Sequence, residues 1–288
     1  MNKFFLLAEY SFHPSYLISK WYETFRDYDG FGGIIVRANE NEELHSSRME
    51  FHNIHQNKKH LTDEEGEYLQ SLYGGLSKSE KVMIQWYGVP YFAQNLSSHL
   101  FFLGEDINSE LIKTWLLNKL EVEDNIFVFV FVDKILSPWW IKVTKGNLFN
   151  AHSAVLPYAR GMFSIERMAY RGNVEKFQQA AGASIHYVDE GIDTGSIIKA
   201  VRIKNPFAFK SLPEVKAHTH NLAFDLLVQL AVEILDNPQN QPAGIKSDPS
   251  LLGPVFATKN YTSQVETIAE QNFLEMKINN ELALYFGP

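Results

Sequence analysis

The sequence predicts an α/β fold with a mostly parallel central sheet, and three features predict it. Phe4–Ala8 is a run of five apolar residues without alternation, which is typical of a short buried strand. A helical pattern and a second apolar run, Ile34–Val36, follow it. Ile126–Val132 consists only of Ile, Val and Phe, as expected for a central parallel strand buried on both faces. Strands that alternate with helices favour a parallel sheet.

The first helix is predicted between the two N-terminal strands. Leu17, Ile18, Trp21 and Phe25 recur at helical spacing, and Pro14 suits the first turn because its missing N–H is unpaired there in any helix. The glycine-rich turn at residues 29–33 then leads into the second strand.

Later elements follow the same logic. After Ser109, a helix face is predicted from Leu111, Ile112, Trp115, Leu116 and Leu120. Further strands are expected at Ile185–Val188 and Ile197–Ile203. Ser211 and Glu214 have the spacing of a capping box, which predicts a long helix that ends at Asn237-Pro238. One more helical stretch is expected after Pro242.

The predicted domain organisation is one catalytic domain over residues 1–240 and a short C-terminal extension over residues 241–288. Residues 38–98 interrupt the pattern, since they are polar at first and carry Trp86, Tyr87, Tyr91 and Phe92 later. This stretch is interpreted either as a long insertion or as irregular structure around a site.

Composition excludes several classes of protein. The 288 residues are 45% apolar, which is ample for a core, and the net charge of −8 argues against a nucleic-acid partner. The absence of cysteine excludes thiolate nucleophiles, iron–sulfur clusters and Cys-based zinc sites. The apolar stretch near the N-terminus is too short for a signal peptide, and no run is long enough to span a membrane, so a cytoplasmic protein is expected.

Several common catalytic motifs are missing. The junction after the first strand, Glu9–His13, has no glycine, which removes the dinucleotide fingerprint. No Walker sequence and no Gly-x-Ser-x-Gly elbow occurs. Four histidines lie close together in the sequence, at His45, His52, His55 and His60. They could form a metal site or lie in a solvated His-rich insertion, and the insertion is favoured.

The most informative residues are Asn150, His152 and Asp193. Asn150 and His152 lie at the end of an apolar segment, and residues two apart in a strand point the same way. Asp193 lies in a loop flanked by Gly191 and Gly195. An amide that donates to an oxyanion, an imidazole and a carboxylate suit acyl transfer. A turn asparagine, a half-buried histidine and a loop aspartate remain the alternative.

These residues resemble the folate-dependent formyltransferase family, which includes the glycinamide ribonucleotide, methionyl-tRNA and amino-sugar formyltransferases. The family pattern is Asn-x-His, a Leu-Pro turn and an Asp in an Ile-Asp-x-Gly loop. This chain shows Asn150 and His152, then Leu156-Pro157, then Ile192–Gly195. Lys134–Pro138 resembles the strand end that binds the pterin. The resemblance covers about residues 126–203.

The resemblance implies a Rossmann-like formyltransferase domain that uses 10-formyltetrahydrofolate as the formyl donor, without a metal. It implies that Asn150 and His152 stabilise the tetrahedral oxyanion, that Asp193 tunes His152 and helps to remove the proton of the attacking amine, and that His186 supports the site. A coupled His152 and Asp193 should give a bell-shaped or single-ionisation rate profile near neutrality. The folate-binding residues implied are Lys134, Ile135, Leu136, Val188, Asp189, Glu190, Gly191 and Ile192.

Features of the family that this sequence lacks reduce the number of candidate acceptor molecules. The glycine-rich phosphate loop of the glycinamide ribonucleotide enzymes is absent. Arg160-Gly161 is similar to the tRNA enzymes, but the basic C-terminal barrel of those enzymes is not seen, and neither is the extra leading domain of the formyltetrahydrofolate hydrolases. The run at residues 185–195 is most similar to the amino-sugar enzymes.

We therefore expect a small amine acceptor, either a nucleotide-linked amino sugar or an amino acid such as hydroxyornithine, with no membrane partner and with a homodimer left open. Residues 38–98 are expected to build the acceptor pocket. The alternatives are a methionyl-tRNA formyltransferase, a formyltetrahydrofolate hydrolase and a non-catalytic relative that binds folate or another metabolite.

Overall fold

The computed structural model describes residues 2–119 and 125–286, and side chains as far as residue 281. The chain divides into two compact units. The first unit comprises residues 1–150 and 227–241, and the second comprises residues 151–226 and 242–288. Among the described residues, no helix is long and apolar enough to cross a membrane.

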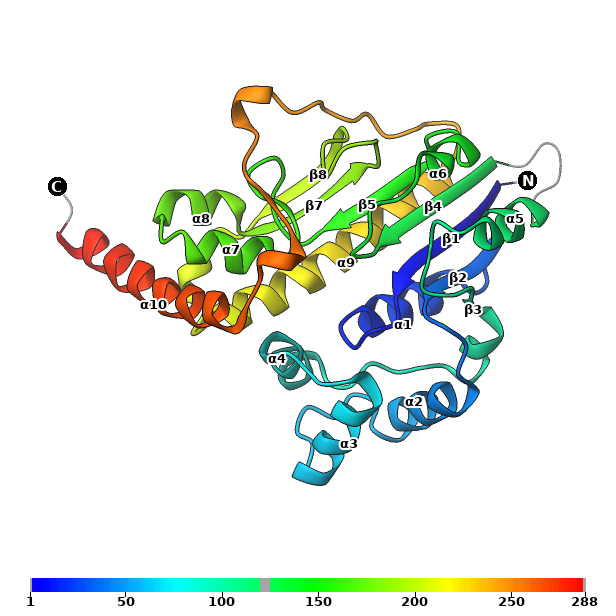
Figure 1. Ribbon diagram of the computed structural model, residues 1–288, viewed down its shortest axis with the longest axis horizontal. Helices are drawn as coiled ribbons and strands as arrows, with labels where there is room; N and C mark the ends of the chain where they lie inside the picture. Colours follow the sequence, from blue (N-terminus) through cyan, green and yellow to red (C-terminus); the bar gives the residue numbers. More distant parts are fainter. Residues whose placement is uncertain (1, 120–124, 287–288) are drawn as a thin grey trace. The chain divides into compact units, whose positions relative to one another are not determined.

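The first unit is built on parallel strands (Figure 1). β1 pairs with β2 on one side and with β4 on the other, β2 pairs with β3, and β4 pairs with the start of β5, all in parallel. Phe4–Ala8 is fully buried, as its unbroken apolar run predicts. The elements of this unit are β1 (Asn2–Glu9), α1 (Pro14–Phe25), β2 (Phe31–Arg37), α2 (Glu42–Ile54), α3 (Asp63–Tyr73), α4 (Lys78–Tyr87), the 3-10 turn η1 (Gln94–His99), β3 (Leu100–Phe102), α5 (Glu110–Asn118), β4 (Asn125–Phe131), α6 (Pro138–Val143) and β5 (Leu148–His152).

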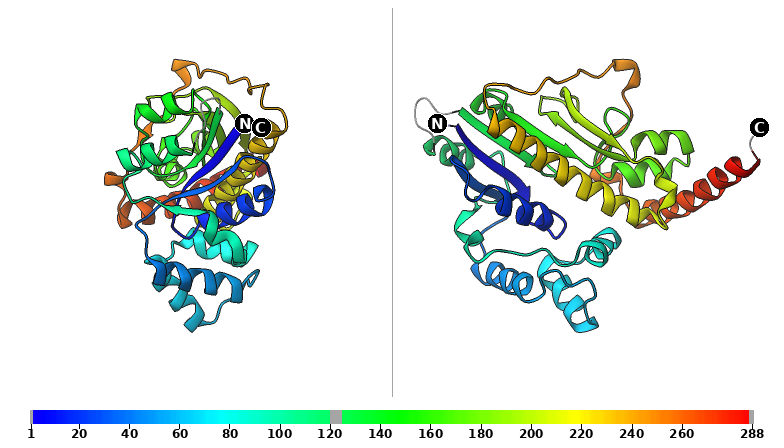
Figure 2. Two further views of the ribbon diagram at one scale, coloured as in Figure 1. Left: turned by 90° about the vertical axis from the view of Figure 1, so that its right-hand side faces the viewer. Right: turned by 180° about the vertical axis from the view of Figure 1, so that it is seen from behind.

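Residues 38–98 form an insertion made mainly of three helices, α2, α3 and α4, rather than irregular structure. Figure 2 shows from two further sides that these helices lie together. Thr62 with Glu65 and Ser77 with Glu80 form complete capping boxes at the starts of α3 and α4. These caps satisfy backbone N–H groups that a helix leaves unpaired, which stabilises two short helices.

The helix after Ser109 is α5, and its buried side is narrower than predicted. Ile112 and Leu116 are buried, whereas Leu111 is 64% exposed, so Leu111 does not belong to the buried face. Trp115 packs edge-on against Phe5, with ring centroids 5.8 Å apart. Leu120 lies outside the described residues.

The second unit begins within β5, whose last two residues belong to it. β7 pairs with β8 in antiparallel fashion, which gives the mostly parallel sheet an antiparallel edge in the strand order β3-β2-β1-β4-β5-β7-β8. Both strands lie where the apolar runs predict them. The elements from here on are β6 (Arg160–Gly161), α7 (Ser164–Tyr170), α8 (Val174–Ala180), β7 (Gly182–Tyr187), β8 (Ile197–Arg202), η2 (Pro206–Ala208), α9 (Leu212–Asp236), η3 (Pro249–Leu251), β9 (Val255–Phe256), η4 (Thr258–Asn260) and α10 (Ser263–Phe286).

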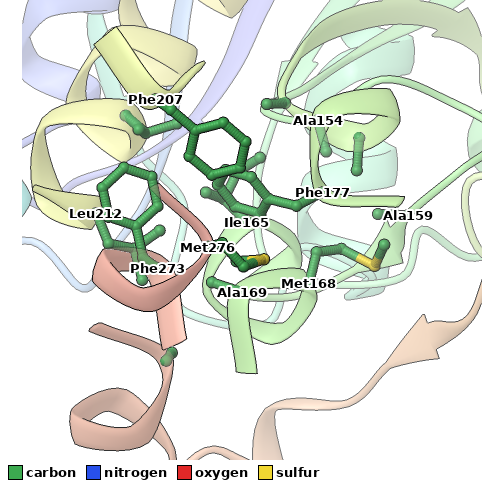
Figure 3. Packing of buried hydrophobic residues seen from close by; sticks show 14 residues of the cluster. Ala154, Ala159, Ile165, Met168, Ala169, Phe177, Phe207, Leu212, Phe273 and Met276 are labelled. Atoms are coloured by element: carbon green, nitrogen blue, oxygen red, sulfur yellow. The ribbon is translucent and has the colours of Figure 1, made fainter. Parts of the chain in front are cut away.

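The core of the second unit joins α7, α8 and the C-terminal helix α10 (Figure 3). Phe273 of α10 packs against Phe177 of α8 and Phe207, with ring centroids 5.6 and 5.8 Å away. Met276 lies in the same buried cluster as Ile165. The predicted C-terminal extension therefore supplies part of this core, and a functional boundary near residue 240 stays a prediction.

Candidate active site

Asn150 and His152 occupy the carboxyl end of β5. Asn150 lies opposite Val130 of the neighbouring parallel strand β4. Asn150 is half-buried, and His152 is buried. In open α/β sheets, ligands bind beyond the carboxyl ends of the strands, so this placement is the one expected of reactive side chains.

Asp193 is held in an unusual backbone conformation in the loop that follows β7. Its φ of 50° lies in the left-handed region, which few residues other than glycine adopt. The loop is closed by Asp189, whose Oδ1 accepts hydrogen bonds from the N–H of Gly191 and the hydroxyl of Thr194. The backbone N–H of Gly161 donates to Oδ2 of Asp193 at 2.7 Å. The loop thus fixes the direction of one carboxylate.

Two imidazole rings flank this carboxylate. Nδ1 of His152 lies 3.7 Å from Oδ2 of Asp193, and Nε2 of His186 lies 3.4 Å from Oδ1. All three side chains belong to the second unit and are largely buried. Three of the residues singled out in the sequence therefore meet in one cluster.

The other nitrogen of each ring forms a hydrogen bond with a backbone carbonyl oxygen. Nε2 of His152 donates to the carbonyl oxygen of Ala159 at 3.0 Å, and Nδ1 of His186 donates to the carbonyl oxygen of Tyr187 at 2.8 Å. A carbonyl oxygen only accepts hydrogen bonds, so these nitrogens carry the proton of a neutral ring. On His152, the nitrogen that faces Asp193 is consequently the one that can accept a further proton.

Burial and charge act in opposite directions at this cluster. Burial lowers the pKa of His152 below its ordinary value, and the attraction of Asp193 offsets only part of that effect. Burial alone would raise the pKa of Asp193, but electrostatic attraction to His152 and His186 and the hydrogen bond from the Gly161 N–H hold this pKa well below its usual range. Near neutral pH, Asp193 is ionised and His152 is a neutral base.

The residues predicted to bind folate lie in two loops, one in each unit. Lys134, Ile135 and Leu136 lie between β4 and α6. Asn108 steadies this loop, because its side-chain amide donates to the Ile135 carbonyl at 2.9 Å and its side-chain oxygen accepts from the Ser137 N–H at 2.7 Å.

The second loop follows β7 and contains Val188, Asp189, Glu190, Gly191 and Ile192. Ile135 and Ile192 are both exposed, at 63% and 39%. Exposed aliphatic side chains can pack against a flat ring such as a pterin. The folate-binding role of these two loops stays a prediction.

Not all of the four histidines between residues 45 and 60 are exposed to solvent. His52 is completely buried, with its ring stacked 4.0 Å from that of Phe92. Its Nδ1 donates to the Pro90 carbonyl and its Nε2 accepts from the Tyr73 hydroxyl, both at 2.7 Å. His52 is thus a satisfied core residue. Residues 2–119 and 125–286 contain no group of three or more His, Asp or Glu side chains arranged to hold a metal ion.

The loop after β1 contains no phosphate cradle, and a carboxylate of the chain lies there instead. Oε1 of Glu80 in α4 accepts hydrogen bonds from the N–H of His13, at 3.1 Å, and from its Nδ1, at 3.0 Å. His13 occupies the N-cap position of α1, where its side chain makes no capping hydrogen bond. The insertion therefore supplies an anion at the helix end where other folds bind phosphate.

Sequence reasoning missed two backbone groups of the site, the N–H of Gly161 and the carbonyl of Ala159. Neither carries a side-chain signal. Gly161 has a φ of 82°, and a Cβ there would lie 2.2 Å from the carbonyl oxygen of Phe256. The glycine in Arg160-Gly161 was the available signal for this position.

Residues 105–230 match the protein family described as formyl transferase. The matched segment is less than half of the chain. It contains Asn150, His152, His186 and Asp193, so the whole cluster lies inside the formyl transferase segment.

Similar proteins match parts of the chain. The trifunctional purine biosynthetic protein adenosine-3 of Chironomus tentans is 31% identical over 99 residues, which are 34% of this chain and 7% of that protein. The phosphoribosylglycinamide formyltransferase of Haemophilus influenzae is 26% identical over 120 residues, 38% of this chain and 54% of that protein. The chain thus spans well under two thirds of these curated relatives.

A solved structure shares the fold over nearly the whole chain. The sugar N-formyltransferase from Shewanella sp FDAARGOS_354 is 12% identical, with a TM-score of 0.52. The match covers 94% of this chain and 88% of the other. This chain therefore shares its α/β fold, with a mostly parallel central sheet, with that structure.

Proposed function

We propose that this protein transfers the formyl group of 10-formyltetrahydrofolate to the amine of a small metabolite. The observation that carries the proposal is the cluster of His152, His186 and Asp193 within the formyl transferase segment. A buried carboxylate that stays ionised beside a neutral imidazole is suited to removing a proton from an attacking amine. Perturbed titration of this kind is common at catalytic sites.

In this proposal, Nδ1 of His152 accepts the proton of the acceptor amine, a role that differs from the oxyanion contact that the resemblance implies for this residue. The Ala159 carbonyl fixes the proton of the neutral ring on Nε2, which leaves the lone pair on Nδ1. Once Nδ1 is protonated, the ring becomes a cation 3.7 Å from Asp193, and the carboxylate stabilises it. Asp193 thus assists the transfer without moving, because Gly161 and the loop around it hold its direction.

Asn150 acts beside His152 on the same strand. Its side-chain N–H groups would donate a hydrogen bond to negative charge that develops on the formyl oxygen. When bound, 10-formyltetrahydrofolate supplies a formyl group that is already activated for attack. The proposed folate-binding residues are Lys134–Leu136 in the first unit and Val188–Ile192 in the second.

The acceptor class is proposed from the sequence around the site. The run at residues 185–195 is most similar to the amino-sugar formyltransferases, so a nucleotide-linked amino sugar is the first candidate, and an amino acid such as hydroxyornithine is the second. The proposed catalytic domain covers residues 1–240. Construction of the acceptor pocket by residues 38–98 stays a prediction.

The test is a formyl-transfer assay with 10-formyltetrahydrofolate and a panel of nucleotide-linked amino sugars, ornithine, hydroxyornithine and methionyl-tRNA. We expect a formylated small amine, detected by mass spectrometry, and loss of that product with Asp193→Asn. A product only on charged tRNA, or formate released without an acceptor, would replace the small-metabolite proposal by the tRNA or hydrolase alternative. Folate binding without turnover on any acceptor would favour a non-catalytic relative.

A further inference from the structure

A small hollow in the second unit lies outside the cluster described above. It is bounded by the C-terminal half of α7 and by the segment from β9 to η4, and its volume is about 210 Å³. Arg167 and Arg171 line it from α7 and its C-terminus, and Phe256 and Asn260 line it from the other side. Two arginines, a phenylalanine and an asparagine therefore line one space.

Aromatic rings lie near the guanidinium groups of both arginines. The guanidinium carbon of Arg167 lies 6.0 Å from the ring centroid of Phe256 and 5.8 Å from that of Tyr261. The guanidinium of Arg171 lies 5.4 Å from the Phe256 ring. Among the described residues, Nε of Arg167 is buried without a hydrogen-bond partner.

The nearby acidic residues act on other groups. Glu166, next to Arg167 in the sequence, pairs with Lys216 at 2.9 Å. Glu266 and Glu270 raise the pKa of the Tyr261 hydroxyl, whose largest perturbation comes from burial. Two arginines thus line the hollow, although the chain as a whole carries a net charge of −8.

This chemistry selects a phosphate group. Guanidinium groups bind phosphate through paired N–H···O bonds, and rings that stack on the guanidinium fix its plane. The volume is below that of a site for a complete drug-sized ligand, so it suits a phosphate or diphosphate whose remaining atoms extend outward. Asn260 and Phe256 also line the space beside the arginines.

The hollow is connected to the proposed active site by a two-strand ladder. β9 pairs with β6, so that Arg160 lies opposite Val255 and Gly161 opposite Phe256. Gly161 is the residue whose N–H holds Asp193. A ligand in the hollow would therefore contact the strand adjacent to the one that positions the carboxylate.

We propose that this hollow binds the diphosphate of a nucleotide-linked acceptor. The identification of the ligand as the acceptor rests on the proposed function, whereas the phosphate site itself rests on Arg167, Arg171 and the hollow they line. Arg171 is the more exposed of the two and is the residue to change, because its loss leaves the buried Nε of Arg167 in place.

The first experiment measures binding without the folate donor. Uridine 5′-diphosphate is titrated into the full chain by calorimetry, for the unaltered protein, for Arg171→Gln and for Arg202→Gln. Arg202 is a matched control, because it also lies over an aromatic ring, that of Tyr158 at 5.5 Å, but outside the hollow. We expect about tenfold weaker binding with Arg171→Gln, a change within about twofold with Arg202→Gln, and displacement of the nucleotide by pyrophosphate.

Three results would overturn the phosphate site: no saturable binding at millimolar nucleotide, equal weakening by the two substitutions, or nucleotide binding that persists in saturating pyrophosphate. Circular dichroism of each variant shows whether it is folded.

Kinetics then identify the source of the phosphate. If the acceptor supplies it, uridine 5′-diphosphate competes with the nucleotide-linked amino sugar, and Arg171→Gln raises KM while kcat stays nearly unchanged. Non-competitive inhibition would overturn the assignment to the acceptor and indicate a free nucleotide as the ligand. Phosphate binding without formyl transfer to any acceptor would overturn the proposed function but not the site.

Discussion

The backbone N–H of Gly161 donates a 2.7 Å hydrogen bond to Oδ2 of Asp193, and this contact orients the carboxylate that faces two histidines. Gly161→Ala should disturb it, because the new Cβ would lie 2.2 Å from the Phe256 carbonyl oxygen and the φ of 82° is strained for alanine. We expect a loss of about 1–3 kcal/mol in unfolding free energy, together with a clear fall in kcat.

Gly172→Ala is the matched control. Gly172 also has a positive φ, of 64°, in the same unit, but a Cβ there would meet nothing closer than 3.6 Å. It should lose some stability and keep kcat. Equal effects of the two substitutions on kcat would show that the Gly161 contact does not orient Asp193.

Asp193→Asn should change both the rate and its pH dependence. Asp193 attracts the charged form of His152 and so raises the pKa of that ring against the lowering effect of burial. Removing the carboxylate lowers the pKa of His152 further. We therefore expect kcat/KM to fall by about 10²–10⁴, and the acid limb of its pH profile to move to lower pH.

Asp248→Asn, which removes an exposed carboxylate from the same unit, is the comparison for this pH series. The profile of Asp248→Asn should match that of the unaltered protein. A limb that stays in place in Asp193→Asn would mean that His152 is not the group that titrates.

Asn150→Ala should reduce kcat by about 10²–10³, the usual effect of removing a side-chain donor to an oxyanion. Asn150 is half-buried at the end of β5, so the substitution leaves the buried residues Phe149 and Ala151 in place. Donor binding, followed by fluorescence quenching, should change little, since the amide acts mainly in the transition state. A fall of less than tenfold, or loss of folate binding instead of turnover, would assign Asn150 a different role.

The parts of the fold that could be predicted are those in which burial dominates the choice of residues. β1 and β4 are read from unbroken apolar runs because both faces of each strand are covered. The approach of Asp193 to His152 follows from their places after β7 and at the end of β5, together with the resemblance of their motifs.

The unpredicted parts depend on backbone groups and on long-range pairing. Gly161 is positioned by the pairing of β6 with β9, about 95 residues later in the chain, and no periodicity reports such a pair. The insertion could have been divided further, since Thr62–Glu65 and Ser77–Glu80 are readable capping boxes. The burial of His52 could not be read, because its partners are the carbonyl of Pro90 and the distant hydroxyl of Tyr73.

His52 should make the stability of the first unit depend on pH. Burial lowers its pKa to about 4 from the ordinary 6.5, and the hydrogen bond to the Pro90 carbonyl offsets only part of this. The folded state therefore excludes a proton that the unfolded state binds between these values. Stability is fully present above about pH 6.5 and is lost as the pH falls towards 4, by at most roughly 3 kcal/mol.

His52→Phe removes this titration, although it leaves the Pro90 carbonyl without its donor and so lowers stability at pH 7. The difference in unfolding free energy between the two proteins, measured by urea denaturation, should narrow as the pH falls from 6.5 to 4. A constant difference would show that His52 does not titrate in this way.

Glu80 gives the last prediction, because it places a carboxylate where α1 begins. Although burial alone would raise its pKa, hydrogen bonds and charge from His13, with hydrogen bonds from Ser77, lower the pKa of Glu80 to about 2 from 4.5. Its stabilisation is therefore present above about pH 4.5 and is lost as the pH falls towards 2.

Glu80→Gln should cost about 1.5–3 kcal/mol of unfolding free energy at pH 7. Glu23→Gln, which alters an exposed pair with Arg26, should cost at most about 1 kcal/mol. Similar losses from the two substitutions, or a Glu80→Gln deficit that persists at pH 2, would mean that the anion at the start of α1 does not stabilise this junction.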